Sequence, residues 1–216
     1  MTNSDIIKFF TSKTTNARFV DKMKIKYRPF ICPFNDLIGF AANKKSMFDI
    51  GCGSGQFCAL IAKYTGVEKI IGIEISESLI TNATEITEEF RGNKTIKFQV
   101  FDGKNIPDEI KDYELIYMID VFHHIPPPQQ LTFIEQLHKK MKPGAILIFK
   151  DIDAGTPMVL FNKVHDIIVS REIGKEISFT NAKDLLSKVG FKIINSFKKT
   201  IFVYAHYFVI CKNDGE

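Results

Sequence analysis

The chain has 216 residues, and 45% of them are hydrophobic, which is ample for one packed core with a modest insertion or cap. Its 29 basic and 25 acidic residues give a formal net charge of only +4. The lysines are scattered rather than gathered into a basic run, so the composition argues against a nucleic-acid partner.

Residues 1–44 precede the first predicted strand and are rich in phenylalanine. Six of these side chains occur there: Phe9, Phe10, Phe19, Phe30, Phe34 and Phe40. We predict that residues 1–44 form an N-terminal helical cap. The first residues contain an acid and no long apolar stretch, which is untypical of a secretory signal, and no later run approaches the ~20 apolar residues of a membrane span. We therefore expect a cytoplasmic protein.

A glycine-rich loop follows the first predicted strand, over 47–50. The sequence MFDIGCGSGQ carries Asp49 near the strand end and then three alternating glycines, Gly51, Gly53 and Gly55, before a predicted helix over 55–64. Glycine adopts positive φ without steric cost, and its missing Cβ lets a ligand approach the backbone closely. The loop is therefore predicted to contact a ligand.

The spacing of these glycines does not fit a dinucleotide-binding loop. The G-x-G-x-x-G pattern would place its third glycine at Gln56, and Asp49 would repel a pyrophosphate. A carboxylate at this position suits an ammonium group instead.

Three further predicted strands also end in an acid. The strand over 69–74 ends in Glu74, about 20 residues beyond the glycine loop, where a carboxylate can hold a ribose diol. The strand over 95–101 is followed by Asp102 and Gly103, and the strand over 113–119 by Asp120.

This repeated pattern, over roughly residues 45–150, closely resembles that of class I S-adenosylmethionine-dependent methyltransferases. The resemblance implies S-adenosylmethionine as cofactor and S-adenosylhomocysteine as product. It also implies that Asp102 bonds the adenine amino group and that Ile75 packs against the ring. The implied cofactor-binding residues are Asp49, Gly51, Cys52, Gly53, Gly55, Glu74, Ile75, Asp102, Gly103 and Asp120.

The remaining periodicity predicts an α/β fold. Helices are predicted over 77–90, 128–141 and 181–189, and strands over 145–150, 191–197 and 201–210, of which the last two are close enough to pair. Alternating strands and helices imply a doubly wound, seven-stranded, mostly parallel sheet with an antiparallel C-terminal strand, the Rossmann-like methyltransferase fold. We assign residues 45–216 to this domain. Ligands in such sheets bind at the carboxyl ends of the strands.

An insertion over 151–180 follows the fifth predicted strand. Its apolar residues Met158, Phe161, Val164 and Ile168 recur at spacings of three and four, which predicts one apolar helix face. We hypothesise that this insertion and the N-terminal segment form a substrate lid around an apolar or aromatic acceptor. The alternative is that the apolar stripe simply packs on the sheet.

Four histidines occupy suggestive positions: His123, His124, His165 and His206. A neutral imidazole near the methyl donor could remove a proton from an acceptor hydroxyl. His124, after the fourth strand, and His165, beside Asp166 in the insertion, are the predicted catalytic residues. Packing remains an alternative for His123 and His124, and His206 is better interpreted as a structural residue of the last strand.

The four cysteines, Cys32, Cys52, Cys58 and Cys211, form no C-x-x-C pair and have no histidines at zinc spacing. We expect reduced, mostly buried thiols and no metal site. Cys52 lies within the glycine loop, where its small size is the expected reason for its presence.

The sequence as a whole predicts an S-adenosylmethionine-dependent methyltransferase that acts by in-line displacement, with catalysis supplied mainly by positioning. The run from Asp120 to His123 lacks the Pro-Pro-aromatic pattern of enzymes that methylate exocyclic amines of nucleic-acid bases. A small, apolar or aromatic, metabolite or lipid-like acceptor is expected. A non-catalytic methyltransferase-like binding protein and a nicotinamide-dependent oxidoreductase are the alternatives, and the acceptor atom and the oligomeric state stay open.

Overall fold

The computed structural model describes residues 2–11, 31–159 and 174–215. The chain forms two compact units, Met1–Asp102 and Gly103–Glu216, which are described in turn. The seven strands follow the order β3-β2-β1-β4-β5-β7-β6, in which the first three belong to the first unit. The predicted boundary at residue 44 stays a prediction, because residues 12–30 of the N-terminal segment lie outside the described residues.

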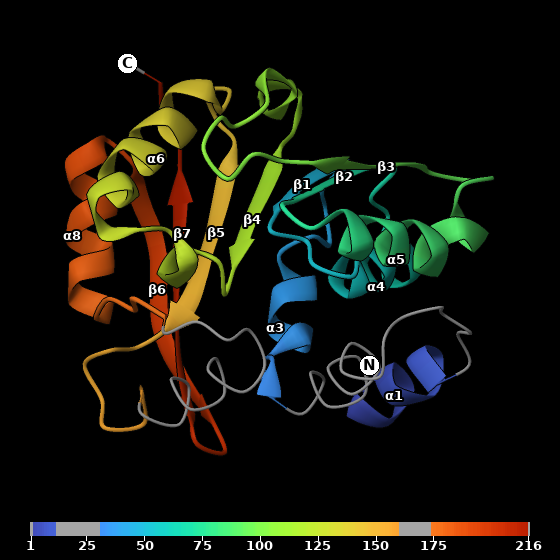
Figure 1. The fold of residues 1–216 in the computed structure, drawn as a ribbon, viewed down its shortest axis with the longest axis horizontal. Helices are drawn as coiled ribbons and strands as arrows, with labels where there is room; N and C mark the ends of the chain where they lie inside the picture. Colours follow the sequence, from blue (N-terminus) through green and yellow to red (C-terminus); the bar gives the residue numbers. More distant parts are fainter. Residues whose placement is uncertain (1, 12–30, 160–173, 216) are drawn as a thin grey trace. The chain divides into compact units, whose positions relative to one another are not determined.

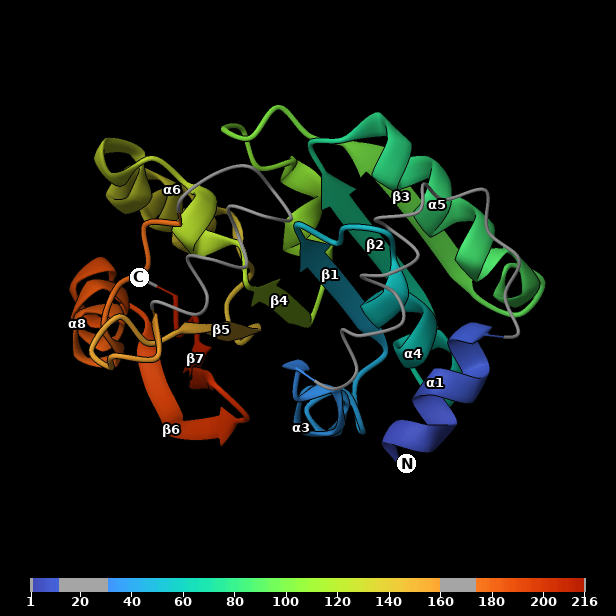
Figure 2. The same ribbon diagram turned by 60° about the horizontal axis from the view of Figure 1, so that its bottom comes forward.

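The first unit is a parallel three-stranded layer with helices. Its elements are α1 (Asn3–Thr11), α3 (Phe34–Gly39), β1 (Ser46–Ile50), α4 (Gln56–Tyr64), β2 (Lys69–Glu74), α5 (Glu77–Thr87), η1 (Glu88–Phe90) and β3 (Thr95–Val100). The strands β1, β2 and β3 pair in parallel, and all five residues of β1 are buried, as is typical of a strand inside a parallel sheet. Figure 2 shows the three arrows running the same way, with α4 and α5 alongside them.

Aromatic side chains join the N-terminal helices of this unit to α4. The rings of Phe34 in α3 and Phe57 in α4 stack with centroids 6.1 Å apart. The Lys63 ammonium in α4 lies 4.1 Å from the centroid of Phe9 in α1. Part of the phenylalanine-rich N-terminal segment is therefore core, whereas Phe19 and Phe30 lie outside the described residues.

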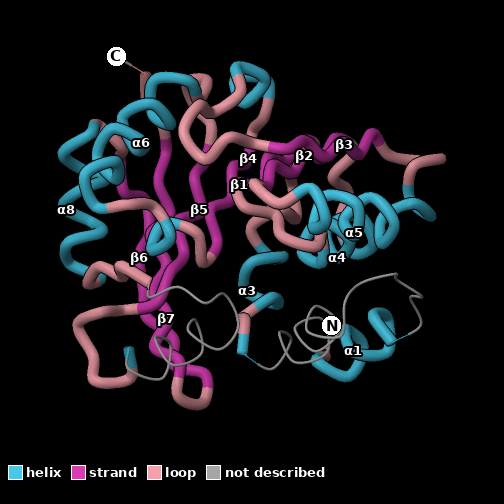
Figure 3. Tube along the Cα trace, in the orientation of Figure 1, coloured by secondary structure: helices cyan, strands magenta, loops and turns pink. Residues whose placement is uncertain are grey.

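The second unit joins parallel and antiparallel strands. Its elements are η2 (Asp108–Asp112), β4 (Leu115–Ile119), η3 (Phe122–His124), α6 (Pro127–Lys140), β5 (Ile146–Ile152), α8 (Phe179–Val189), β6 (Lys192–Ile201) and β7 (Tyr204–Lys212). The strands β4 and β5 are parallel, whereas β7 is antiparallel to both β5 and β6. Figure 1 and Figure 3 show α6 and α8 side by side, flanking these strands.

The predicted fold class is confirmed, with shifts at several element ends. The strand β5 continues to Ile152, two residues past its predicted end, and α8 begins at Phe179 rather than residue 181. The strand β6 continues to Ile201, past its predicted end at residue 197, and β7 runs over Tyr204–Lys212 rather than 201–210, so Phe202 and Val203 form the turn and not part of the last strand. Among the described ranges, no helix is long and apolar enough to cross a bilayer.

Candidate cofactor site and acceptor-side residues

The loop between β1 and α4 depends on glycine for its backbone. Gly51, Gly53 and Gly55 have φ values of 71°, 55° and 72°, a region that side chains disfavour. A Cβ on Gly55 would also lie 2.7 Å from both Cα and Cβ of Ala83 in α5. Gly55 is thus required both for the turn and for the close approach of α5.

Backbone hydrogen bonds tie this loop to the end of β2. The N–H groups of Gly51 and Cys52 both donate to the carbonyl oxygen of Ile73, at 2.8 and 3.0 Å. The loop is therefore held at the carboxyl end of β2, which is the edge where ligands of open parallel sheets bind.

The Glu74 carboxylate connects the glycine loop to the start of α5. Its Oε2 accepts from the Gly53 N–H at 3.1 Å, and its Oε1 accepts from the Ile75 and Ser76 N–H groups at 2.8 and 3.2 Å. A carboxylate offers about four lone-pair directions, so these three bonds leave capacity for a ligand hydroxyl. Sequence reasoning found the acid at the strand end but not its second role in bracing the loop.

Asp49 is buried behind the loop. Its Oδ2 lies 3.4 Å from the Cys58 Sγ in the first turns of α4, where a negative charge is favoured by the helix dipole. Burial, and secondarily the Asp49 charge, raises the pKa of the Cys58 thiol well above its usual value. Cys58 is therefore an inert core thiol, and the other three cysteines are also buried.

Two aliphatic side chains are exposed beside Glu74. Ile75, which follows β2, is 66% exposed, and Val100, which pairs with Glu74 at the end of β3, is also exposed. Exposed apolar groups next to a carboxylate suit a ligand with a flat ring joined to a diol. The family resemblance predicted that Ile75 packs against the adenine ring, but the sequence analysis did not predict Val100 as a site residue. The one sequence signal for Val100 is its position as the last residue of β3. Asp102, two residues beyond β3, is exposed at the end of this unit.

In the second unit, Asp120 neutralises a buried lysine. The Lys150 Nζ in β5 lies 2.5 and 2.7 Å from the two carboxylate oxygens of Asp120. The Lys150 side chain is 0% exposed and that of Asp120 is 26% exposed. Asp120 also has a φ of 55°, and its N–H donates to the Lys150 carbonyl oxygen at 2.9 Å. The predicted cofactor-binding acid is thus also the counter-ion of an internal cation. Gly103, at the start of this unit, has a φ of 79°.

The two adjacent histidines after β4 have different environments. The ring Nδ1 of His123 lies 2.6 Å from the Asp151 Oδ1, and the His123 N–H donates to the other carboxylate oxygen at 3.2 Å. Both side chains are almost fully buried, so Asp151 fixes the His123 ring. His124 is exposed, and its ring centroid lies 4.1 Å from that of His123. His206 is buried within β7, as expected for a structural residue.

Asp153 joins the two ends of the 151–180 insertion. Its Oδ1 accepts from the N–H groups of Gly155 and Phe179 at 2.9 and 3.0 Å, and its Oδ2 lies 2.6 Å from the Lys198 Nζ. Burial raises the pKa of Asp153, but the Lys198 ammonium and these amide donors outweigh that effect and hold the pKa below its usual value. The predicted lid residues Phe161, Val164, His165 and Ile168 lie outside the described residues.

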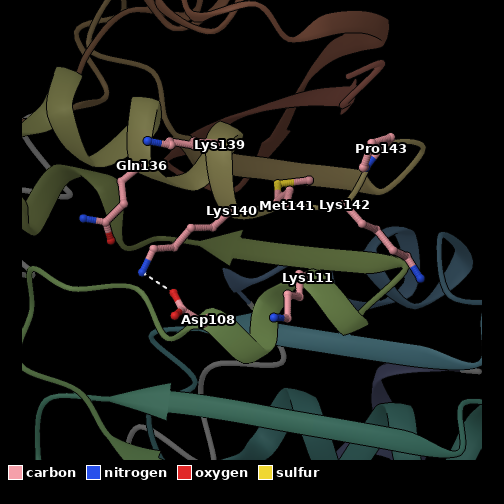
Figure 4. Close-up of a pocket in the computed structure, with 8 residues that line it drawn as sticks. All are labelled: Asp108, Lys111, Gln136, Lys139, Lys140, Met141, Lys142 and Pro143. Carbon is pink, nitrogen blue, oxygen red and sulfur yellow. Dashed lines mark ion pairs between the residues drawn. The ribbon is translucent and has the colours of Figure 1, made fainter. Parts of the chain in front are cut away.

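A cavity of about 770 Å³ lies elsewhere in this unit, between η2 and the C-terminal end of α6. Figure 4 shows Lys140 reaching Asp108 across it, at 2.7 Å, with Lys111 and Lys142 nearby. These elements precede β4 and β5, so the cavity lies at the amino ends of those strands, opposite Asp120 and Lys150. The dipole of α6 favours lysines near its C-terminus, so these lysines do not require a ligand to explain them. We therefore assign this cavity no ligand.

No cluster of three or more metal-ligating side chains exists in residues 2–11, 31–159 or 174–215. The groups at the strand ends of the first unit are a carboxylate, backbone amides and apolar side chains, which suit an organic ligand.

The chain is similar in sequence to known methyltransferases. A family model described as a methyltransferase domain matches residues 24–196. The chain is 28% identical over 120 residues to the ubiquinone biosynthesis O-methyltransferase of Coxiella burnetii. The matched region covers 56% of this chain and 49% of that relative. It is 29% identical over 106 residues to the 2-methyl-6-phytyl-1,4-hydroquinone methyltransferase of a Synechocystis species. That matched region covers 49% of this chain and 31% of the relative. The chain therefore spans half or less of the length of these curated relatives.

A solved structure of a SAM-dependent methyltransferase from Aquifex aeolicus has a TM-score of 0.67 to this chain at 18% identity. The match covers 89% of this chain and 95% of that one. At this identity the likeness concerns the fold alone.

Proposed function

Because this chain belongs to the family of class I S-adenosylmethionine-dependent methyltransferases, we propose that it methylates a small apolar or aromatic acceptor, either a metabolite or a lipid-like molecule. Its cofactor is S-adenosylmethionine, whose sulfonium supplies an electrophilic methyl group. Membership of this family removes the nicotinamide-dependent oxidoreductase from consideration. The observation that carries the cofactor assignment to particular residues is the Glu74 carboxylate bonded to the Gly53 N–H.

In this proposal, different residues of the first unit bind different parts of the cofactor. Gly53 exposes backbone at a positive φ, which allows the close approach of an amino-acid end. Glu74 accepts hydrogen bonds from the ribose hydroxyls while its other lone pairs keep the loop in place. Ile75 and Val100 cover one face of the adenine, and Asp102 accepts from its amino group.

Two further acids have different roles in this proposal, because Asp49 is buried and the Asp120 carboxylate is partly exposed. Asp49 lies behind the loop and offsets a cationic ammonium group. Asp120 would contribute through the part of its carboxylate that stays exposed beside Lys150. Gly51 contributes backbone and Cys52 a small side chain to the loop of the first unit in this proposal, and Gly103 contributes backbone in the second unit.

The proposed acceptor class rests on two observations. These are the names of the relatives and the apolar residues of segments 1–44 and 151–180. One relative is named for ubiquinone biosynthesis and another for a phytyl hydroquinone, and a quinone or hydroquinone ring with an isoprenoid chain is a lipid-like compound. The lid proposal for residues 1–44 and 151–180 adds phenylalanine-rich and apolar segments. The hydrogen bonds from the Gly155 and Phe179 N–H groups to Asp153 support this proposal, because they hold the two described ends of this segment close together.

Transfer of a labelled methyl group from S-adenosylmethionine to a panel of phenols, catechols and hydroquinones, with and without an isoprenoid chain, tests the acceptor class. We expect label in the organic extract with at least one aromatic member. Methylation confined to polar amines or to nucleic acid would contradict the proposal.

The histidine variants test the acceptor side with whichever panel member is methylated. His124→Ala and His165→Ala should each leave the dissociation constant of S-adenosylmethionine nearly unchanged. Turnover should fall about 10²-fold or more for a general base, and by less if the side chain only positions the acceptor. Only loss of a base should remove a titrating limb from the pH–rate profile.

His138→Gln is the matched control, because His138 packs against Phe191 at the far end of α6. Full turnover in both His124→Ala and His165→Ala would end the catalytic role of these residues. An equal loss of cofactor affinity in His165→Ala would show that the insertion is not a separate acceptor lid.

A further inference from the structure

Asp120, the residue that follows β4, is held in a backbone conformation that side chains disfavour. Its φ of 55° lies in the left-handed region, which aspartate tolerates better than most residues but still at a cost in free energy. The hydrogen bond from its N–H to the Lys150 carbonyl oxygen, at 2.9 Å, helps to maintain this conformation. Residues in such conformations cluster at active sites, so a role beyond the turn is worth seeking for Asp120.

The Lys150 ammonium fixes the direction of the Asp120 carboxylate. It lies 2.5 and 2.7 Å from the two carboxylate oxygens, and it bonds no other side chain in the part of the chain that the structure describes. Phe208 of β7 lies directly opposite Lys150 and stacks on Phe197, with ring centroids 4.5 Å apart. Directly opposite residues share a face of the sheet, so the lysine stem has an aromatic neighbour there and Asp120 remains as the partner of its charge.

The two charged side chains differ in what a ligand can reach. The Lys150 side chain is 0% exposed, whereas that of Asp120 is 26% exposed. The ion pair cancels most of the carboxylate charge, so Asp120 adds little to the attraction for a cationic cofactor. What remains at the carboxyl edge of β4 is a hydrogen-bond acceptor in a fixed orientation, four residues before the exposed His124.

We propose that Asp120 accepts the hydroxyl proton of an aromatic acceptor, and that Lys150 is the positioning residue that holds its carboxylate. This inference rests on the proposed function and adds to it the atom that is methylated, a hydroxyl oxygen. That oxygen bonds to the methyl carbon as the carbon–sulfur bond breaks, and its proton passes to Asp120 and then to solvent. A carboxylate paired with lysine is a weak base, but a hydroxyl becomes strongly acidic as its oxygen bonds to carbon.

Other titratable side chains lie near Asp120 in this unit. The His123 Nδ1 lies 2.6 Å from the Asp151 Oδ1, so this pair is already joined, and both side chains are almost fully buried. Burial raises the pKa of Tyr207 well above its usual value, so Tyr207 stays protonated at neutral pH. His124, whose ring lies beside that of His123, is left with a positioning role in this proposal.

The double variant Asp120→Asn/Lys150→Met removes the proton acceptor without leaving a buried charge unpaired. With a phenolic acceptor that the wild type methylates, its turnover should fall about 10²-fold or more, while its dissociation constant for S-adenosylmethionine should change less than about threefold. Relative to the wild type, its residual turnover should rise about tenfold per pH unit, because only the ionised acceptor then reacts. Any titration of His124 is common to both proteins and cancels in this ratio.

A nitro-substituted derivative of the same acceptor tests the proton transfer itself. Its hydroxyl is already ionised at slightly alkaline pH and needs no base, so the deficit of the double variant should shrink about tenfold or more. Lys150→Met alone should lose about tenfold in turnover and keep the pH dependence of the wild type, because Asp120 remains but is no longer held. Full turnover of Lys150→Met would overturn the positioning role.

Asp108→Asn/Lys140→Met is the matched control, because it makes the same changes in an ion pair of 2.7 Å at the amino ends of the strands. Its turnover should equal that of the wild type. Calorimetry with S-adenosylhomocysteine present gives a readout without turnover, in which Asp120→Asn/Lys150→Met should bind the phenolic acceptor about fivefold more weakly or worse.

Three results would contradict this inference alone. They are wild-type turnover in Asp120→Asn/Lys150→Met, wild-type affinity of that variant for the phenolic acceptor, and an equal deficit with the nitro-substituted derivative. A wild-type chain that methylates no member of the panel would instead contradict the proposed function, and with it this inference.

Discussion

Replacing Asp120 with asparagine should lower the free energy of unfolding by about 3 kcal/mol, because it leaves the buried Lys150 ammonium without its counter-ion. Asparagine tolerates the left-handed backbone that Asp120 adopts, so the substitution isolates the effect of the charge. The double variant Asp120→Asn/Lys150→Met should recover most of the loss, since methionine fills the site without a cation. Urea unfolding followed by circular dichroism measures all three proteins.

The exposed pair Lys45–Glu68 is the matched control for this prediction. Its charged atoms are 2.5 Å apart, but both side chains are about two-thirds exposed or more. Glu68→Gln should therefore change the free energy of unfolding by less than about 1 kcal/mol. If Asp120→Asn cost no more than Glu68→Gln, or if the double variant were as unstable as the single, the buried ion pair would not be important for stability.

Replacing Glu74 with alanine should weaken S-adenosylmethionine binding by roughly 1 to 3 kcal/mol, or about 5- to 150-fold in the dissociation constant. The ribose loses a charged acceptor, and the Gly53 N–H loses the bond that fixes the loop. Gly53→Val should do more harm, because a β-branched side chain resists a φ of 55° and occupies ligand space. Calorimetric titration measures both variants.

Glu77→Ala is the control for the Glu74 variant, because Glu77 is an exposed acid three residues further along, in the first turn of α5. Its affinity for S-adenosylmethionine should match that of the wild type. Unchanged affinity in Glu74→Ala would place Glu74 outside the cofactor site, and normal binding by Gly53→Val would contradict the role given to the loop.

The strands of the first unit could be predicted because local sequence encodes both their core and their ends. The strands β1 and β2 are mostly apolar and buried, and the glycines after β1 and the acid that ends β2 mark where each strand stops. The partners of these acids could not be predicted. Asp120 bonds Lys150 across 30 residues, and this contact exists only because β4 and β5 pair in register.

The hairpin was the least well predicted part for a different reason. The exposed strand β6 mixes lysines with apolar residues and has little alternation to reveal its length. Its turn contains phenylalanine and valine where glycine or asparagine would be expected, so the usual sequence signal for a turn is absent. The histidines after β4 were found from the sequence, but the burial of His123 against Asp151 depends on β5 and could not be predicted.

Calorimetric titration of the wild-type chain with S-adenosylmethionine, and separately with NAD and NADP, tests the central claim most directly. The glycine loop, the Glu74 carboxylate and the buried Asp49 predict saturable binding of S-adenosylmethionine and no binding of either dinucleotide, whose pyrophosphate the Asp49 charge repels. Binding of a nicotinamide dinucleotide without binding of S-adenosylmethionine would contradict the account.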